Sequence, residues 1–341
     1  MSRLPLSLID FCTIYDDESA GESMQRSVEL AQRAEELGYS RIWYAEHHNM
    51  PTIASSSPAV LISHIGARTQ KIRLGAGGVM LPNHSPYVIA EQFGTLGELY
   101  PDRIDLGLGR APGTDQNTLG RALRRDPRAA ENFPNDVVEL HGYFRGRPTV
   151  PGVTAVPGVG AKMPLYILGS SMFGATLAAK LGLPYSFASH FAPQHLVQAT
   201  TYYKENFEPS EVLDQPYVIA AVNVTVAPTR AEAEEQTVGV HRARVKRMMG
   251  RRGRVLNDEQ LDQVVDSYQG QQIIDMLRFT GIGTGDEVVE YLEEFAELAK
   301  ADELMISLQG RTNDEAMQSM EILADAWELS PETVVGAPGN F

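Results

Sequence analysis

Short apolar runs alternate along this chain with longer stretches in which apolar residues recur every three or four positions. The short runs are rich in β-branched residues and predict buried strands, whereas the longer stretches predict amphipathic helices. Strands are predicted at 4–12, 41–48, 71–82, 103–110, 164–171, 184–191, 217–227 and 303–310, and the clearest helices at 23–39, 57–70, 85–100, 173–183, 193–207 and 313–329. Eight successive strand–helix units predict a parallel (β/α)8 TIM barrel rather than a doubly wound sheet.

Residues at the predicted helix ends support this reading. Gly38 occupies a helix C-cap position, and Ser57-Pro58 and Ser85-Pro86 are typical of N-cap and N1 pairs. Two stretches depart from the regular alternation. Residues 111–162 are polar and then rich in Pro and Gly, which predicts an insertion after strand 4, and a mostly helical region precedes strand 8. We expect residues 1–341 to form a single domain.

A second glycine-rich stretch, GIGTGDEVVEYL, lies in that helical region. Phosphate binds near the seventh and eighth strands in many barrels, but Thr284 and Glu287 have the spacing of a capping box. We therefore interpret this stretch as a helix start.

Composition narrows the range of functions. Apolar residues make up 43% of the chain, and no apolar run is long enough to span a bilayer. The formal net charge of −15 opposes nucleic-acid binding, so the basic run at 241–254 is interpreted as solvated helix surface. Cys12 is the only cysteine, which excludes an internal disulfide. With no secretory signal at the N-terminus, we expect a cytoplasmic protein.

In a barrel of this kind, active sites lie at the carboxyl ends of the strands. Strand 2 ends in Glu46, His47 and His48. Adjacent residues of an extended chain point to opposite faces, so these three cannot close on one metal ion. At most one of the two imidazoles can face the centre of the barrel.

Small and polar residues end the other strands, among them Gly77-Gly78, Gly109-Arg110, Ser170-Ser171, His190 and Gln309. Backbone N–H groups and serine hydroxyls at a helix N-terminus suit a phosphate, although a serine there can simply cap the helix. Arg110, at the end of the neighbouring strand, could reach the same anion. Alternatively, Arg110 is a structural residue paired with Asp105 or Asp115.

The segments WYAEHHNMP, GAGGVMLPNHSPYVIAEQF, RIDLGLGRAPGTD and YILGSSMFGATLAAKLGLPYSFASHF together resemble the bacterial luciferase-like family of flavin-dependent monooxygenases. The resemblance covers nearly all of residues 5–200 and continues more weakly to the last strand. It implies a (β/α)8 barrel, reduced FMN as the working flavin, and reaction with O2.

The resemblance also implies residue roles. His47 matches the catalytic histidine of the luciferase α subunit, and Arg110 matches the arginine that holds the FMN phosphate. Ser170 and Ser171 match the pair that contacts this phosphate, with Met172 beside them. Gly78 falls where the backbone passes the flavin ring, at a position associated with a non-prolyl cis peptide.

Two residues depart from the luciferase pattern. Gly109 replaces the reactive cysteine, and Ser170 replaces a glutamate, so light emission is not implied.

We therefore expect an FMN-dependent monooxygenase that oxygenates a small organic substrate. A deazaflavin (F420)-dependent dehydrogenase and a non-catalytic flavin-binding protein are the alternatives. Because no nicotinamide fingerprint is present, reduced flavin is expected from a separate reductase. The helix at 85–100 is apolar on more than one face, which, with the family's habit of pairing through its early helices, predicts a homodimer.

Overall fold

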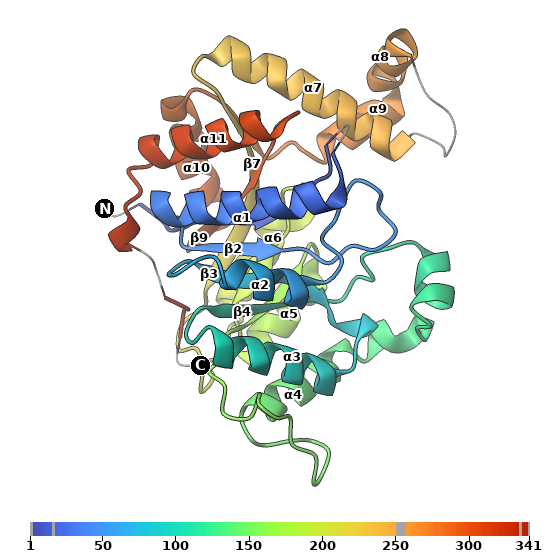
Figure 1. Ribbon diagram of the computed structural model, residues 1–341, viewed down its shortest axis with the longest axis vertical. Coiled ribbons are helices and arrows are strands. Elements are labelled where there is room, and N and C mark those ends of the chain that lie inside the picture. The colour runs from blue at the N-terminus through green and yellow to red at the C-terminus, as the bar shows by residue number, and fades with distance from the viewer. Residues whose placement is uncertain (1–2, 16–17, 250–256, 334–335, 340–341) are drawn as a thin grey trace.

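Eight parallel strands close into a barrel in the computed structural model, which describes residues 3–15, 18–249, 257–333 and 336–339 (Figure 1). The barrel strands are β1 (Leu6–Asp10), β2 (Arg41–Tyr44), β3 (Arg73–Met80), β4 (Ile104–Gly109), β5 (Leu165–Gly169), β6 (Tyr185–Phe187), β7 (Val218–Val226) and β9 (Glu303–Leu308). They pair in the order β6-β5-β4-β3-β2-β1-β9-β7, and pairing of β6 with β7 closes the ring. The predicted TIM barrel is confirmed.

A ninth strand, β8 (Thr280–Gly283), was not predicted. It pairs with the second half of β7, while β6 pairs with the first half. These four residues include two glycines and show no alternation of apolar and polar positions, so the sequence predicted only the start of a helix here. The capping box itself is confirmed, because Thr284 is the N-cap of the following helix and its backbone N–H donates a hydrogen bond to Glu287 at 2.9 Å.

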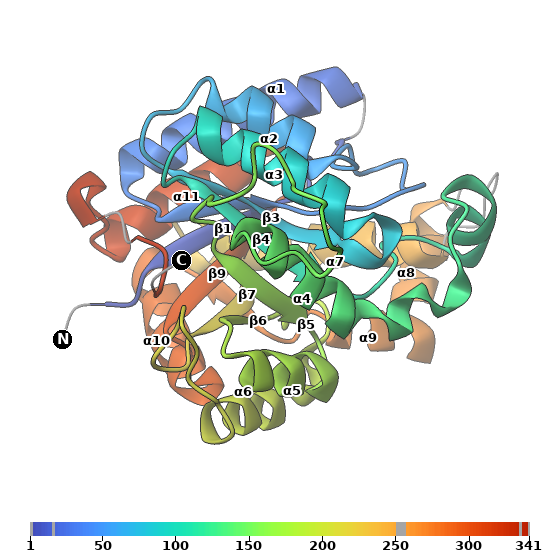
Figure 2. The same cartoon turned by 90° about the horizontal axis from the view of Figure 1, so that it is seen from below.

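Helices surround the strands, with α1–α3 on one side of the barrel and α5 and α6 on another (Figure 2). Their bounds are α1 (Ala20–Leu37), α2 (Pro58–Gly66), α3 (Pro86–Leu99), α5 (Met172–Leu181), α6 (Leu196–Glu205), α10 (Gly285–Ala299) and α11 (Asn313–Ala326). Gly38 ends α1 with a φ of 92°, a left-handed conformation that favours glycine. Ser57 and Ser85 precede α2 and α3 as predicted, but neither side chain makes a capping hydrogen bond. No helix among the described residues is both long and apolar enough to cross a membrane.

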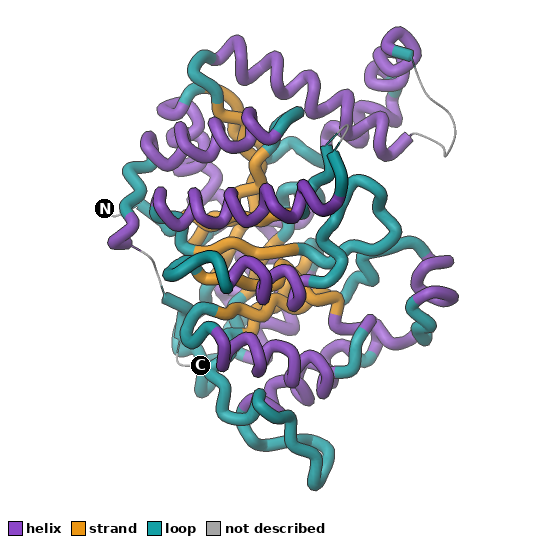
Figure 3. Tube along the Cα trace, in the orientation of Figure 1, coloured by secondary structure: helices purple, strands orange, loops and turns teal. Residues whose placement is uncertain are grey.

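The stretch 111–162, which we predicted to be an insertion after strand 4, contains a regular helix. Helix α4 (Phe133–Phe144) is the crossover between β4 and β5, and its Val137, Leu140 and Phe144 are buried. A π-helical turn at Thr118–Ala122 and a 3-10 turn at Pro127–Glu131 precede it, and a long loop follows it (Figure 3). The stretch is therefore one βα unit with long connections at both ends.

The loop after α4 also covers part of α3. A Cβ atom added to Gly94 of α3 would lie 2.2 Å from Gly158 Cα, so the two backbones are in close contact. One of the apolar faces of α3 is therefore covered within the chain and needs no partner. The homodimer stays a prediction.

Three helices precede β8, as the sequence indicated. They are α7 (Arg230–Met249), α8 (Asp258–Asp266) and α9 (Tyr268–Asp275), and they lie at one side of the molecule in Figure 1. The basic run at 241–254 is helical up to Met249, and its last residues lie outside the described part of the chain.

A network of charged side chains fills the amino-terminal end of the barrel. Arg41 is fully buried and donates hydrogen bonds to Asp105 (2.7 Å), Glu303 (2.8 and 3.1 Å) and the Tyr166 hydroxyl (2.8 Å). Arg73 donates to the other oxygen of Asp105 at 2.6 and 3.1 Å. Buried charges are tolerated when they are paired and hydrogen-bonded in this way. Together with Trp43 and Tyr166, whose rings are 4.9 Å apart, this network closes the barrel below its mouth.

Candidate functional site

Glu46, at the carboxyl end of β2, is the centre of a hydrogen-bond cluster. Its buried carboxylate accepts from the backbone N–H of Met80 (2.9 Å), His48 Nε2 (2.9 Å) and His84 Nε2 (2.9 and 3.0 Å). Burial raises the pKa of Glu46, but the hydrogen bonds from His48 and His84 prevail and lower it to about 2. Glu46 therefore stays charged and holds the ends of β2 and β3 together.

His47 and His48 point to opposite sides of the chain, as the alternation predicted. His48 is turned to Glu46, and its backbone N–H donates to the Gly113 carbonyl at 3.0 Å. The His47 ring lies 5.9 Å from the Phe11 ring, and its Nδ1 is buried without a hydrogen-bond partner in the described part of the chain. Burial lowers the pKa of His47, so its imidazole is neutral at pH 7.

His190, which follows β6, also contacts the Phe11 ring, at a ring distance of 6.0 Å. Neither of its ring nitrogens has a hydrogen-bond partner among the described residues. Burial, together with the positive charge of Arg244, lowers the pKa of His190 to about 3. Sequence reasoning noted His190 only as a strand-end residue and missed Arg244, which it placed on a solvated helix surface. Gln309, by contrast, is structural, because its amide donates to Asn223 and Ser307 at 2.9 Å.

The backbone of β3 forms another part of the mouth. The Gly77–Gly78 peptide is cis, as the resemblance led us to expect. A Cβ atom on Gly78 would lie 2.7 Å from the Gly107 carbonyl oxygen, so only glycine fits there. The close packing of β3 against β4 therefore requires a glycine at this position.

Arg110 lies at the end of β4 with its guanidinium carbon 4.0 Å from the centre of the Phe173 ring, on the first turn of α5. Neither rival partner binds it. Asp105 belongs to the buried network at the other end of the barrel, and Asp115 accepts from Thr118 and Asn49. The contact with Phe173 brings Arg110 to the N-terminus of α5.

Ser170, Ser171 and Met172 occupy that N-terminus. Ser171 is the N-cap of α5, but its side chain makes no capping hydrogen bond, so the alternative reading of a simple cap is not supported. The structure thus brings together Arg110, two serines and the first N–H groups of a helix, a combination that suits an anion.

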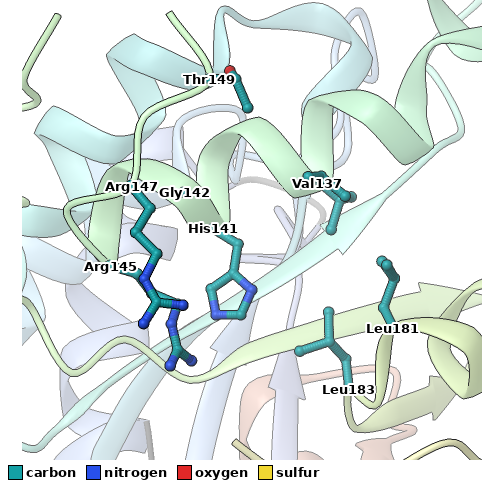
Figure 4. Close-up of a pocket in the computed structure, with 9 residues that line it drawn as sticks. Val137, His141, Gly142, Arg145, Arg147, Thr149, Leu181 and Leu183 are labelled. Carbon is teal, nitrogen blue, oxygen red and sulfur yellow. The ribbon is translucent and has the colours of Figure 1, made fainter. Parts of the chain in front are cut away.

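A cavity of about 310 Å³ lies outside the barrel, against α4 (Figure 4). Leu181 and Leu183 form one wall, and His141, Arg145 and Arg147 approach from α4 and the loop after it. Both arginines pair with Glu211. Because this cavity is remote from the strand carboxyl ends, we do not place the active site there.

Comparison with known proteins gives a consistent result. Residues 8–301 match the family described as luciferase-like monooxygenase. A luciferase-like monooxygenase of Escherichia coli K12 is 44% identical over 329 residues, which cover 95% of this chain and 97% of the relative. The structure of apo-MsnO8 is similar with a TM-score of 0.85 at 32% identity, covering 96% of this chain and all of the other.

A more distantly related structure shares only the fold with this chain. The oxygenating constituent of 3,6-diketocamphane monooxygenase from Pseudomonas putida, in complex with FMN, has a TM-score of 0.70 at 17% identity and covers 98% of this chain and all of the other.

Proposed function

We propose that this chain, which belongs to the luciferase-like monooxygenase family, uses reduced FMN and O2 to oxygenate a small organic substrate. The observation that carries the proposal is the cluster at the N-terminus of α5. Arg110 stacks on Phe173 and forms no ion pair within the described chain, so its N–H groups are free to bind a phosphate. The oxygenating constituent of 3,6-diketocamphane monooxygenase, which has the same fold, is in complex with FMN.

The residues at the mouth fit FMN. Arg110, Ser170, Ser171 and Met172 would hold the phosphate through guanidinium, hydroxyl and backbone N–H groups. The backbone at Gly78 would lie against the flat ring, as the resemblance implies for this position. When bound and reduced, FMN supplies the reaction with O2, and the protein supplies binding, orientation and electrostatics.

His47 is the residue that we assign to proton transfer. Its ring is held next to Phe11, and its buried Nδ1 has no partner in the described chain. A neutral imidazole can accept a proton and return it, and burial keeps His47 neutral at pH 7. Glu46 and His48 fix the end of the strand on which His47 lies. A separate reductase would supply reduced flavin.

Oxygen uptake tests this function. Purified protein is titrated with FMN and with F420, and O2 consumption is then followed with reduced FMN across a panel of small organic substrates. We expect FMN binding and substrate-dependent O2 uptake with incorporation of one ¹⁸O atom from ¹⁸O2 into the product. Binding of F420 alone, with hydride transfer and no O2 uptake, would favour a dehydrogenase. Bound FMN without turnover of any substrate would favour a flavin-binding protein.

A further inference from the structure

Buried nitrogen atoms without partners occur on His47 and His190, which both contact Phe11, and on Arg244 of α7. They are His47 Nδ1, both ring nitrogens of His190, and Arg244 Nε, and none has a hydrogen-bond partner in the described part of the chain. Arg244 also forms no ion pair there, whereas Arg242, two residues earlier on α7, pairs with Asp258 at 3.0 Å and with Asp262. Other arginines on α7 can therefore find acidic partners, and the lack of one is specific to the position of Arg244.

These groups influence one another electrostatically. Both imidazoles contact the Phe11 ring, His47 at a ring distance of 5.9 Å and His190 at 6.0 Å. The positive charge of Arg244 contributes to lowering the pKa of both imidazoles, after the larger effect of burial. Burial also lowers the pKa of Arg244 itself, and the neighbouring charge that adds to this effect is positive, on Arg247. The site is thus a cation beside two neutral imidazoles.

Such an arrangement is unfavourable in the free protein. A buried donor without an acceptor costs free energy, and the cost is larger when the donor is charged. The chain has 44 acidic residues, and its buried Arg41 and Arg73 are fully paired. The guanidinium of Arg244, which has no ion-pair partner among the described residues, is therefore suited to bind an anion from outside the chain. Its planar fork matches a carboxylate.

The position of Arg244 separates this anion from the cofactor phosphate. The proposed phosphate residues follow β4 and β5, whereas His190 follows β6 and Arg244 lies on α7. We propose that Arg244, with an N–H of His190, binds a carboxylate of the substrate, so that the organic substrate is an anion. This inference rests on the proposed function, because the substrate in question is that of the monooxygenase.

A matched pair of probes tests the inference. 4-Phenylbutanoate and 4-phenylbutanamide have the same length and differ in charge. Their affinities for the FMN-loaded wild-type protein and for Arg244→Met are measured by calorimetry. Lys246→Met is the control, because Lys246 is on the same helix but exposed. We expect the acid to bind the wild type and the control at least about tenfold more tightly than the amide, the effect of one charged hydrogen bond. In Arg244→Met the two probes should bind equally.

Two further readouts exclude other roles of Arg244. If Arg244 supports the fold, Arg244→Met will lower the melting temperature and leave the ratio of acid to amide affinity unchanged. If Arg244 instead binds the flavin, the affinity for FMN will fall in Arg244→Met and not in the control variant. Either result overturns the inference. Two results with the wild type also overturn it: equal affinity for the acid and the amide, or no detectable binding of the acid. If the wild type binds no FMN, the proposed function fails, but the same titration of the flavin-free protein still measures the preference for the acid.

Discussion

Replacing Glu46 by glutamine removes one negative charge from the mouth and keeps the size of the side chain. The carboxylate accepts from Met80 N, His48 Nε2 and His84 Nε2, each at 2.9 Å. A glutamine amide offers one oxygen as acceptor, and its NH2 group would face at least one of these donors. The cluster cannot remain fully satisfied in Glu46→Gln.

The size of the loss follows from the pKa of Glu46, which lies at about 2 instead of the ordinary 4.5. At about 1.4 kcal/mol per pKa unit, this difference corresponds to roughly 3 kcal/mol of folding free energy. Because the pKa is lowered in the folded state, the contribution is complete above the ordinary pKa and is lost as the pH falls toward 2. At pH 4 it should be smaller by about 1 kcal/mol.

Urea unfolding followed by tryptophan fluorescence measures both effects. We expect Glu46→Gln to be about 3 kcal/mol less stable than the wild type at pH 7, with a smaller gap at pH 4. Glu98→Gln is the control, since Glu98 is exposed, and it should change stability little at either pH. Equal stability of wild type and Glu46→Gln at pH 7, or a gap that does not narrow at pH 4, would refute the reasoning.

Four other outcomes can be measured directly. Arg110→Ala should weaken FMN binding by about 1.5–3 kcal/mol in a fluorescence titration without lowering the melting temperature, and Arg110→Lys should restore only part of the loss. His47→Ala should lower substrate oxidation about 10²-fold or more with near-normal FMN affinity and release of hydrogen peroxide, whereas His48→Ala should be milder. Arg41→Met should cost about 3–5 kcal/mol in urea unfolding, because it leaves two buried carboxylates without this partner. Light scattering should give a dimer at micromolar concentration, and a monomer would contradict the predicted pairing.

The barrel could be predicted from the sequence because its strands are largely buried and read as short apolar runs, whereas the crossover helices show apolar residues at helical spacing. β2 is fully buried and reads as an uninterrupted run, whereas α1 alternates between buried and exposed residues with helical spacing. β8 could not be predicted in this way. It forms because β6 pairs with only the first half of β7 and leaves the second half of that strand free to pair with residues 280–283. This pairing depends on the tertiary structure and not on the sequence of residues 280–283.

The strand-end residues were predictable for a related reason. Once the strands are parallel, their carboxyl ends must share one face, so His47, Gly78, Arg110 and His190 could be assigned to the mouth from topology alone. The distance of Asp105 from Arg110 follows from the same rule, because a residue at the beginning of β4 cannot reach the end of that strand.

Arg244 could not be assigned from the sequence. It belongs to a dense run of basic residues on α7, and only the packed position of the helix decides which of them turns inward. His84 gave no signal for a similar reason, since its partner Glu46 is 38 residues away and is reached only through the turn after β3. Partners of this kind are set by tertiary structure.

The two ends of the barrel differ in whether their arginine is paired within the described chain, and this difference distinguishes a role in stability from a role in binding. At the amino-terminal end, the guanidinium of Arg41 is matched by two carboxylates and a hydroxyl, so adding a ligand there could only displace bonds that already exist. At the mouth, Arg244 and the imidazoles of His47 and His190 keep nitrogen atoms without partners in the described chain, which a closed network would have satisfied. Pairing Arg244 by a nearby acidic substitution should therefore stabilise the free protein and weaken binding of an anionic substrate, whereas breaking the Arg41 network should destabilise the fold before it affects the mouth.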